Sequence, residues 1–162
     1  MVVDVGARYD TDYIEISGGN GIEYYLFEIN PKFYAKLKRK LLRFNENVHA
    51  ENVAVGERNG FTEYFEDSES VLRSTTGVKN SSMKLGSDIE MVRLDHYLSS
   101  KHVTQVDFLK TDIEEYDYFA LVGFGEFLNA CRYIQFELGI GAPIDDAIVT
   151  IEASVIHDIT TG

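Results

Sequence analysis

The sequence lacks the features that mark disulfide-bonded, membrane-spanning and nucleic-acid-binding proteins. It contains one cysteine, Cys131, so no disulfide can form within the chain and a reducing compartment is expected. It has no run of about 18 apolar residues and no signal-like opening, and we therefore expect a cytoplasmic protein with no membrane partner. It has 15 basic and 27 acidic residues, which gives a formal charge of −12. Such a charge repels phosphate backbones, so no nucleic-acid partner is expected.

Several catalytic motifs are also absent. There is no G-x-S-x-G nucleophile motif. The G-x-G-x-x-G dinucleotide pattern is missing, because position 8 is Arg8 and no glycine follows Gly6 until Gly18. This disfavours a nicotinamide or flavin cofactor, although a nucleotide-binding oxidoreductase stays open as an alternative. The histidines are scattered without metal-ligand spacing, which argues against a zinc site: His49, His96, His102 and His157.

The first thirty-one residues organise the rest of the chain. Apolar runs at 1–5 and 24–27 predict two buried strands of a βαβ unit. Gly6 ends the first run, where it would either let a ligand approach the backbone or simply form a tight turn. Glu28 ends the second run, about twenty residues later, which is the distance at which nucleotide-binding units place an acid for ribose hydroxyls. The alternative for Glu28 is a solvated charge, but together these features predict an adenosine-containing ligand across the strand ends.

Strands and helices alternate along the remaining chain. Asn30 is a good N-cap with Pro31 at the first helical position, and Phe33 and Leu37 begin an apolar helical spacing that continues to residue 44. The basic cluster at 36–40 falls on the polar face of that helix and is interpreted as solvated surface. Strands are predicted at 48–55, 61–65, 89–94, 106–111 and 132–138, and helical segments at 10–17, 95–98, 112–122 and 144–155.

This alternation predicts an α/β fold with a mainly parallel sheet. We expect one domain over residues 1–162, with a loop or hairpin insertion around 57–95. Residues 66–88 are rich in serine and acids without periodicity, which is typical of a functional or disordered loop. We expect this loop to face the substrate.

Charged residues gather at the carboxyl end of the strand at 106–111. Lys110, Asp112 and Glu114 could bind a ligand, abstract a proton or hold a metal from that position. The alternative is structural, because Asp112 and Glu115 have the spacing of a helix capping box. Both interpretations can hold together.

Six blocks, in this order, resemble the FkbM-type S-adenosylmethionine-dependent methyltransferases. They are Val3-Asp4-Val5-Gly6-Ala7, Phe27-Glu28-Ile29-Asn30-Pro31, Asn52-Val53-Ala54-Val55-Gly56, Arg93-Leu94-Asp95, Asp107-Phe108-Leu109-Lys110-Thr111-Asp112-Ile113-Glu114 and Gln135-Phe136-Glu137-Leu138. The resemblance implies a class I methyltransferase fold, a Rossmann-like sheet that carries S-adenosylmethionine. It also implies methylation of a hydroxyl oxygen on a small molecule or a saccharide.

The resemblance assigns roles to particular residues. Asp4, Gly6 and Ala7 would contact the amino-acid portion of S-adenosylmethionine, Glu28 would hold its ribose, and Asn52, Val53 and Ala54 would line its adenine. Lys110, Asp112 and Glu114 would border the methyl-transfer site, with Asp112 as the preferred base or orienting group and Glu114 as the second choice.

The sequence departs from the family pattern at three places. Arg8, Tyr9 and Asp10 stand where small residues are expected, and Glu115 replaces a glycine. The sequence ends at Gly162, before the usual last pair of antiparallel strands, so we expect the strand at 132–138 to form an exposed edge. A homodimer through that edge, or a C-terminal segment folded back on it, would cover it. These departures leave open a degenerate binding or interaction module that has the fold but no turnover.

Overall fold

The computed structural model describes residues 1–11, 14–15, 21–44, 47–67, 74–75, 83–113 and 116–137. The predicted helix at 144–155 and most of the predicted segment 10–17 lie outside these ranges. Among the helices within them, none has the length and hydropathy to cross a membrane.

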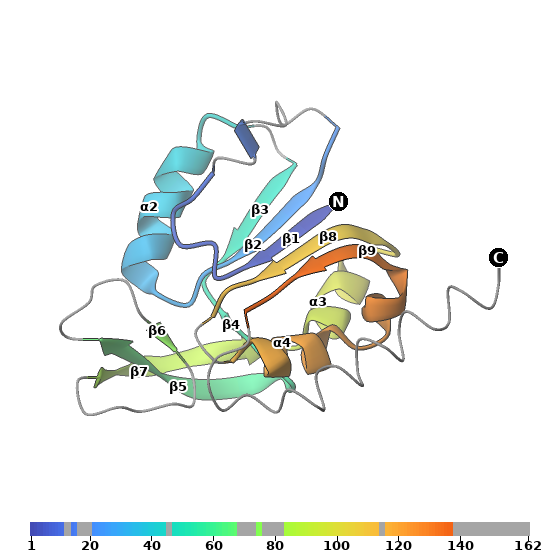
Figure 1. The fold of residues 1–162 in the computed structure, drawn as a ribbon. Helices are drawn as coiled ribbons and strands as arrows, with labels where there is room; N and C mark the ends of the chain where they lie inside the picture. Colours follow the sequence, from blue (N-terminus) through green and yellow to red (C-terminus); the bar gives the residue numbers. More distant parts are fainter. Residues whose placement is uncertain are drawn as a thin grey trace, which may run out of the picture.

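The centre of the protein is a five-stranded parallel sheet (Figure 1). Its strands are β1 (Val2–Val5), β2 (Tyr24–Phe27), β3 (Val48–Glu51), β8 (Val106–Thr111) and β9 (Cys131–Gln135), in the spatial order β3-β2-β1-β8-β9. Every neighbouring pair is parallel, which confirms the predicted α/β class with a Rossmann-like sheet. The chain builds outward from β1 to β3 and then returns to the other side of β1. The loops after β1 and β8 therefore meet at a topological switch point, where such sheets bind ligands.

Helix α2 (Pro31–Leu41) follows β2 as predicted. The Asn30 side chain accepts hydrogen bonds from the backbone N–H groups of Lys32 and Phe33, a cap that stabilises a helix by about 1 kcal/mol. Phe33 and Leu37 are buried, and the lysines lie on the outer face. The start of α2 is thus fixed directly beside Glu28.

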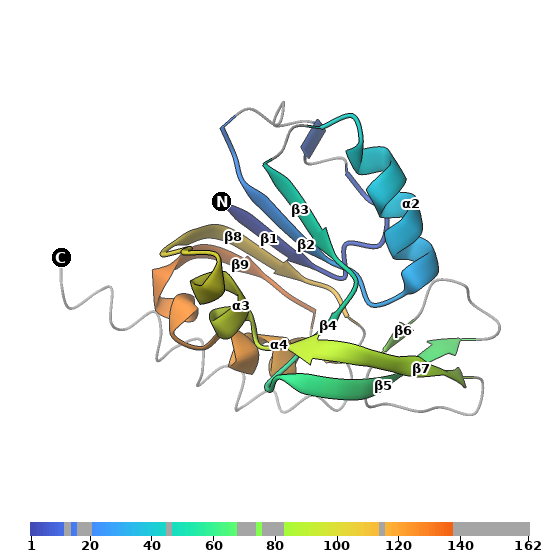
Figure 2. The same cartoon turned by 180° about the vertical axis from the view of Figure 1, so that it is seen from behind.

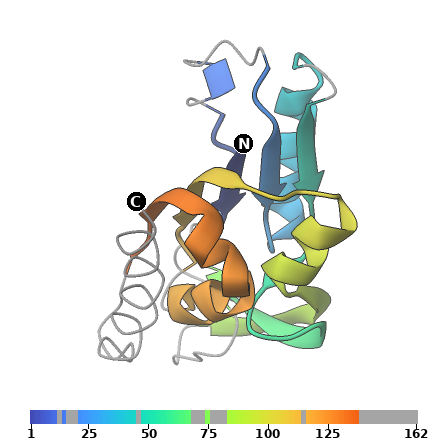
Figure 3. The same ribbon diagram turned by 90° about the vertical axis from the view of Figure 1, so that its right-hand side faces the viewer.

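The two faces of the main sheet pack against different helices (Figures 1 and 3). Tyr24 and Leu26 of β2 pack on one face with Leu37 of α2. Val3 and Val5 of β1 point to the other face, toward α3 (Leu94–Ser100) and α4 (Asp117–Phe124). Alternate residues of each strand face opposite sides, so the short all-apolar runs in the sequence serve two cores.

A second sheet lies at the end toward which the parallel strands point (Figures 1 and 2). It contains β4 (Ala54–Val55), β5 (Gly60–Asp67), β6 (Ser74–Thr75) and β7 (Met83–Val92), in the order β4-β7-β5-β6. The prediction of one strand over 48–55 is therefore wrong. The chain turns at Asn52, whose side-chain amide donates to the Glu28 and Ile29 carbonyls, and β4 then pairs with β7.

The prediction of a structureless connection over 66–88 is also wrong for much of that segment. Strand β5 continues to Asp67 and β7 begins at Met83, and the two pair in antiparallel fashion with an irregularity between Glu63 and Phe65. The pairing agrees with the expected hairpin insertion around 57–95. A backbone hydrogen-bond ladder does not need apolar periodicity, so the composition of 66–88 does not show how far the two strands extend.

The helix after β8 begins later than predicted. Tyr116 occupies the N-cap of α4 and Asp117 is its first residue, so the capping-box interpretation of Asp112 is wrong. Gly123 lies within the helix, which continues to Phe124. It packs on the Gly56 carbonyl, and a Cβ at this position would lie 2.0 Å from the carbonyl oxygen, which accounts for the glycine. The helix ends at Gly125, with φ of +55°, and continues as a short 3₁₀ segment, η1 (Gly125–Ala130).

Candidate cofactor and active site

Gly6 joins the carboxyl ends of the central strands. Its backbone φ is +85°, a conformation that favours glycine, and a Cβ there would lie 2.1 Å from the carbonyl oxygen of Asp112. Its N–H donates to the Phe27 carbonyl at 2.9 Å. Close packing against the loop after β8 therefore accounts for a glycine at this position, and the same packing brings three strand ends together.

Glu28 lies at the centre of this junction. Its side chain is only 3% exposed. One carboxylate oxygen accepts the Arg8 N–H and the other accepts the Asn30 N–H, each at 2.7 Å. Burial raises the pKa of Glu28 to about 7, although the two backbone hydrogen bonds act in the opposite direction. The structure thus rules out the alternative of a solvated charge.

The carboxylate of Glu28 keeps acceptor capacity for a ligand. An ionised carboxylate offers about four lone-pair sites, and the two backbone N–H groups occupy one on each oxygen. Two further donors, such as a pair of ribose hydroxyls, match what remains.

The residues expected beside the adenine lie at the crossing from β3 to β4. Asn52 donates to the carbonyls of Glu28 and Ile29 at 2.7 and 2.9 Å, so it ties this crossing to the end of β2. Val53 is partly buried against the main core, whereas Ala54 is buried with Tyr64 and other residues of the second sheet.

Asp4 and Ala7 are buried on the strand and loop that flank Gly6. Ala7 packs into the core beneath α2 with its N–H bonded to the Phe27 carbonyl. Asp4 is 1% exposed, and Lys110 of the neighbouring strand places its Nζ 3.3 Å from the Asp4 Oδ1. The parallel register that sets Asp4 opposite Lys110 forms this ion pair.

Lys110 also reaches toward Asp112. Its Nζ lies 3.7 Å from the Asp112 Oδ2, and the Asp112 side chain is 47% exposed. Asp4, Lys110 and Asp112 therefore form one charged cluster across β1 and β8, with a single lysine between a buried and a half-exposed carboxylate. Glu114 and Glu115 lie outside the described residues.

A buried acid that the sequence analysis did not single out lies behind this cluster. Asp117 is 1% exposed, and burial raises its pKa. Its Oδ2 accepts the Ile113 N–H at 3.4 Å, whereas its Oδ1 and the Thr111 Oγ1 have no hydrogen-bond partner within the described part of the chain. Asp117 escapes prediction because the start of this helix is predicted at Asp112. With the correct start, Asp117 is an acid in the first turn of α4, a position that favours negative charge.

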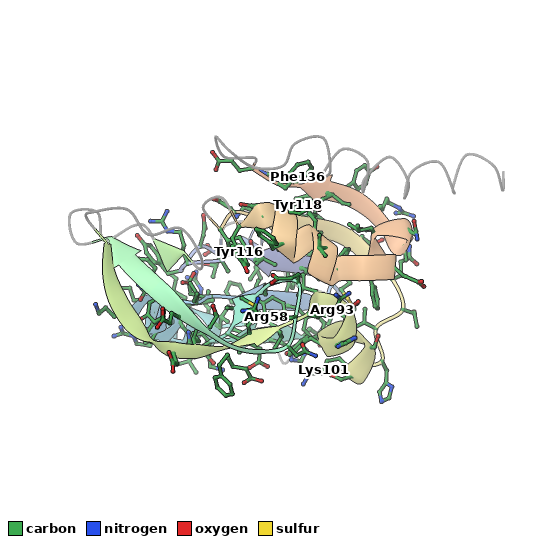
Figure 4. All side chains as sticks on the ribbon, turned by 90° about the horizontal axis from the view of Figure 1, so that it is seen from below. Arg58, Arg93, Lys101, Tyr116, Tyr118 and Phe136 are labelled. Carbon is green, nitrogen blue, oxygen red and sulfur yellow. The ribbon has the colours of Figure 1, made fainter. Side chains whose placement is uncertain are left out.

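The start of α4 is fastened to the second sheet. The Tyr116 hydroxyl donates to Glu57 at 3.0 Å, and burial together with that carboxylate raises the pKa of Tyr116 to about 12. Glu57 also pairs with Arg58 at 2.5 Å. Tyr116 and Arg58, which both contact Glu57, are labelled in Figure 4. These contacts tie Tyr116, the N-cap residue of α4, to Glu57 in the turn between β4 and β5. Over the ranges that the structure covers, no three His, Cys, Asp or Glu side chains gather closely enough to hold a metal ion.

Comparisons with known proteins agree with this architecture. The chain is similar in structure to the crystal structure of methyltransferase FkbM from Methylobacillus flagellatus KT, with a TM-score of 0.51 and 16% sequence identity. The match covers 79% of this chain and 29% of that chain, so this chain spans under a third of that protein's length. At this identity the similarity shows the fold alone.

Sequence comparison identifies the family directly. No curated protein is similar enough to this chain to count as a match. The family model described as the methyltransferase FkbM domain, however, matches residues 4–159, which is nearly the whole chain. The chain belongs to the FkbM methyltransferase family.

Proposed function

We propose that this protein is an S-adenosylmethionine-dependent methyltransferase that acts on a hydroxyl oxygen of a small molecule or a saccharide. The observation that carries the proposal is Glu28, an almost fully buried carboxylate at the switch point of a parallel sheet. Both of its oxygens are oriented by backbone N–H groups, as a preorganised binding group requires.

The residues around Glu28 fit the cofactor. The free lone pairs of Glu28 suit the two ribose hydroxyls, and membership in the FkbM family supports S-adenosylmethionine as the molecule that carries them. Asn52 would hold the strand crossing on which the adenine lies, and the backbone of residues 4–7 would lie beside the amino-acid end. When bound, S-adenosylmethionine supplies an electrophilic methyl group on sulfur.

Asp112 is the residue best suited to receive the acceptor's proton. It is half exposed at the rim of the site, and its backbone is held against Gly6. Lys110 lies between Asp4 and Asp112, so its single positive charge offsets part of their combined negative charge and helps to orient Asp112. A hydroxyl positioned against Asp112 would lose its proton to the carboxylate as its oxygen bonds to the methyl group. The bond from that methyl group to sulfur would break at the same time and leave S-adenosylhomocysteine, so alignment and one base suffice.

Cofactor binding tests the first half of the proposal. Titration calorimetry with S-adenosylhomocysteine should show saturable binding that Glu28→Ala weakens by about 100-fold, because two hydrogen bonds to a charged acceptor are lost. Glu28→Gln keeps the side-chain volume and should weaken binding by about tenfold. The matched control is Glu23→Ala at the opposite end of β2, where the side chain is 44% exposed. If the wild-type protein shows no binding at millimolar ligand, the proposal is wrong.

Methyl transfer tests the second half. Transfer of labelled methyl groups from S-adenosylmethionine to a panel of saccharides and small alcohols should identify an acceptor. With that acceptor, Asp112→Asn should lower kcat by about 100-fold or more and leave cofactor affinity unchanged. Asp107→Asn is the control, since Asp107 lies near the start of the same strand with the same 47% exposure. Binding without transfer to any acceptor would instead favour the non-catalytic binding module.

A further inference from the structure

A second charged site lies on the outer face of the protein, between the loop after β1 and helix α2. Tyr9 and Phe33 form an edge-to-face pair with ring centroids 5.7 Å apart. Three cationic side chains surround this pair, and we call the five residues the Tyr9 cage: Arg8, Tyr9, Phe33, Lys36 and Lys40.

The three cations of the Tyr9 cage converge on one aromatic ring. The Arg8 guanidinium lies 5.9 Å from the centroid of Tyr9, the Lys36 ammonium 5.2 Å and the Lys40 ammonium 5.4 Å. The ring quadrupole attracts each of them, but like charges so close together also repel one another. A local concentration of positive charge is unusual in a chain whose formal charge is −12.

Arg8 is held toward this cluster by its backbone. Its φ is +51°, a left-handed conformation that non-glycine residues adopt infrequently, and its N–H is bound to Glu28. Its Nε is buried and has no hydrogen-bond acceptor within the described residues. A buried donor without an acceptor indicates a place for an anionic or polar group.

The cage borders a hollow of suitable size. The hollow has a volume of about 340 Å³ and is lined by Arg8, Tyr9, Asp10 and Lys40. Arginine and lysine together, beside an aromatic surface, are the usual partners of phosphate oxygens. Among the four described residues that line this hollow, Asp10 is the acidic one, and it would favour a ligand whose hydroxyls can donate to a carboxylate next to the phosphate.

We propose that the Tyr9 cage binds the phosphate group of a small phosphorylated molecule such as a sugar phosphate. The site is distinct from the Glu28 carboxylate, whose hydrogen bond to this loop comes from the Arg8 backbone N–H. The proposal therefore does not depend on methyl transfer, and phosphate binding can be measured without the cofactor.

The experiment uses the whole chain and two probes, inorganic phosphate and glucose 1-phosphate, with glucose as the uncharged comparison. Titrations at constant ionic strength, followed by amide chemical shifts, should show saturable shifts centred on residues 8–10 and α2 for both phosphates and none for glucose. Tighter binding of glucose 1-phosphate than of inorganic phosphate would identify a sugar phosphate as the ligand class. Equal affinity for the two would show that the site recognises the phosphate group alone. Either result supports the site.

Charge-removing variants locate the binding. Arg8→Asn should weaken phosphate binding by about tenfold, and asparagine tolerates the left-handed backbone, so the loop should be retained. Lys40→Gln should weaken it by about fivefold. The matched control is Lys38→Gln on the same helix, whose ammonium lies over Tyr34 instead. Equal loss in Lys38→Gln and Lys40→Gln, or no saturable shift with either phosphate at 10 mM or so, would overturn the proposal.

Discussion

The two acidic ends of the central strands differ in how their carboxylates are held. Glu28, at the end of β2, is buried and bound by two backbone N–H groups, and its pKa rises to about 7. Asp112, at the end of β8, is half exposed and lies beside Lys110. A fixed, buried carboxylate suits a group that binds, whereas a half-exposed one at the rim of the site can be reached by an acceptor hydroxyl. Four measurements would break or sharpen this contrast.

The largest loss of stability is expected at Gly6, which contacts both the end of β2 and the loop after β8. Gly6→Ala places a methyl group 2.1 Å from the Asp112 carbonyl at a φ of +85°, so it should lower the free energy of unfolding by about 4 kcal/mol. Gly21→Ala, at a φ of +72°, meets no described atom within 4 Å and should cost only about 1–2 kcal/mol. Urea denaturation of both variants measures the difference. Equal losses would mean that the contact between the two ends contributes nothing.

The next effect is the pH dependence that Glu28 imposes. A carboxyl group whose pKa is raised on folding favours the folded state at low pH, and this contribution is lost as the pH rises toward the folded value. The free energy of unfolding should therefore fall by about 3 kcal/mol between pH 4 and pH 8 because of Glu28. In Glu28→Gln this decrease should disappear.

Ligand affinity provides an independent measure of the same titration. In the proposed site the ribose hydroxyls would donate to the ionised form of Glu28. The affinity for S-adenosylhomocysteine should therefore rise as the pH passes through about 7. An affinity that is constant from pH 6 to pH 8 would contradict the assignment of Glu28 to the ribose.

The smallest effect concerns the strand crossing that supports Glu28. Asn52→Ala removes two hydrogen bonds to the carbonyls of Glu28 and Ile29, and should lower the free energy of unfolding by about 1–2 kcal/mol. It should also weaken cofactor binding several-fold, because the end of β2 loses its support. Asn47→Ala at the opposite end of β3 is the matched control and should change neither quantity. A variant as stable as the wild type would show that the crossing is held by other contacts.

Much of the candidate site could be predicted from local sequence. Glu28 follows a short apolar run and precedes the Asn30-Pro31 helix start, and both features are local. The same holds for Lys110, which is the second-to-last residue of β8, and for Asp112, which directly follows that strand. The blocks that resemble the family also lie in or next to these strands, and the family was confirmed.

Other parts depend on contacts between distant segments. The register of β1 and β8 pairs Asp4 with Lys110 across more than one hundred residues, and nothing near Asp4 indicates its partner. The sequence predicts Asn52 as part of one strand. In the structure its side-chain amide donates hydrogen bonds to the end of β2, and the predicted strand is divided into β3 and β4 at this point. The pairing of two copies through the β9 edge stays a prediction.

The sequence by itself determined the alternation of strands and helices, the acid and the glycine at the strand ends, and the family. These follow from apolar periodicity and capping chemistry, which act over a few residues. Only the tertiary structure decided that Glu28 is buried and held by Arg8 and Asn30, that Gly6 is required by the Asp112 carbonyl, and that three cations surround Tyr9. Burial, register and close backbone contact arise between segments far apart in the chain, and no local pattern records them.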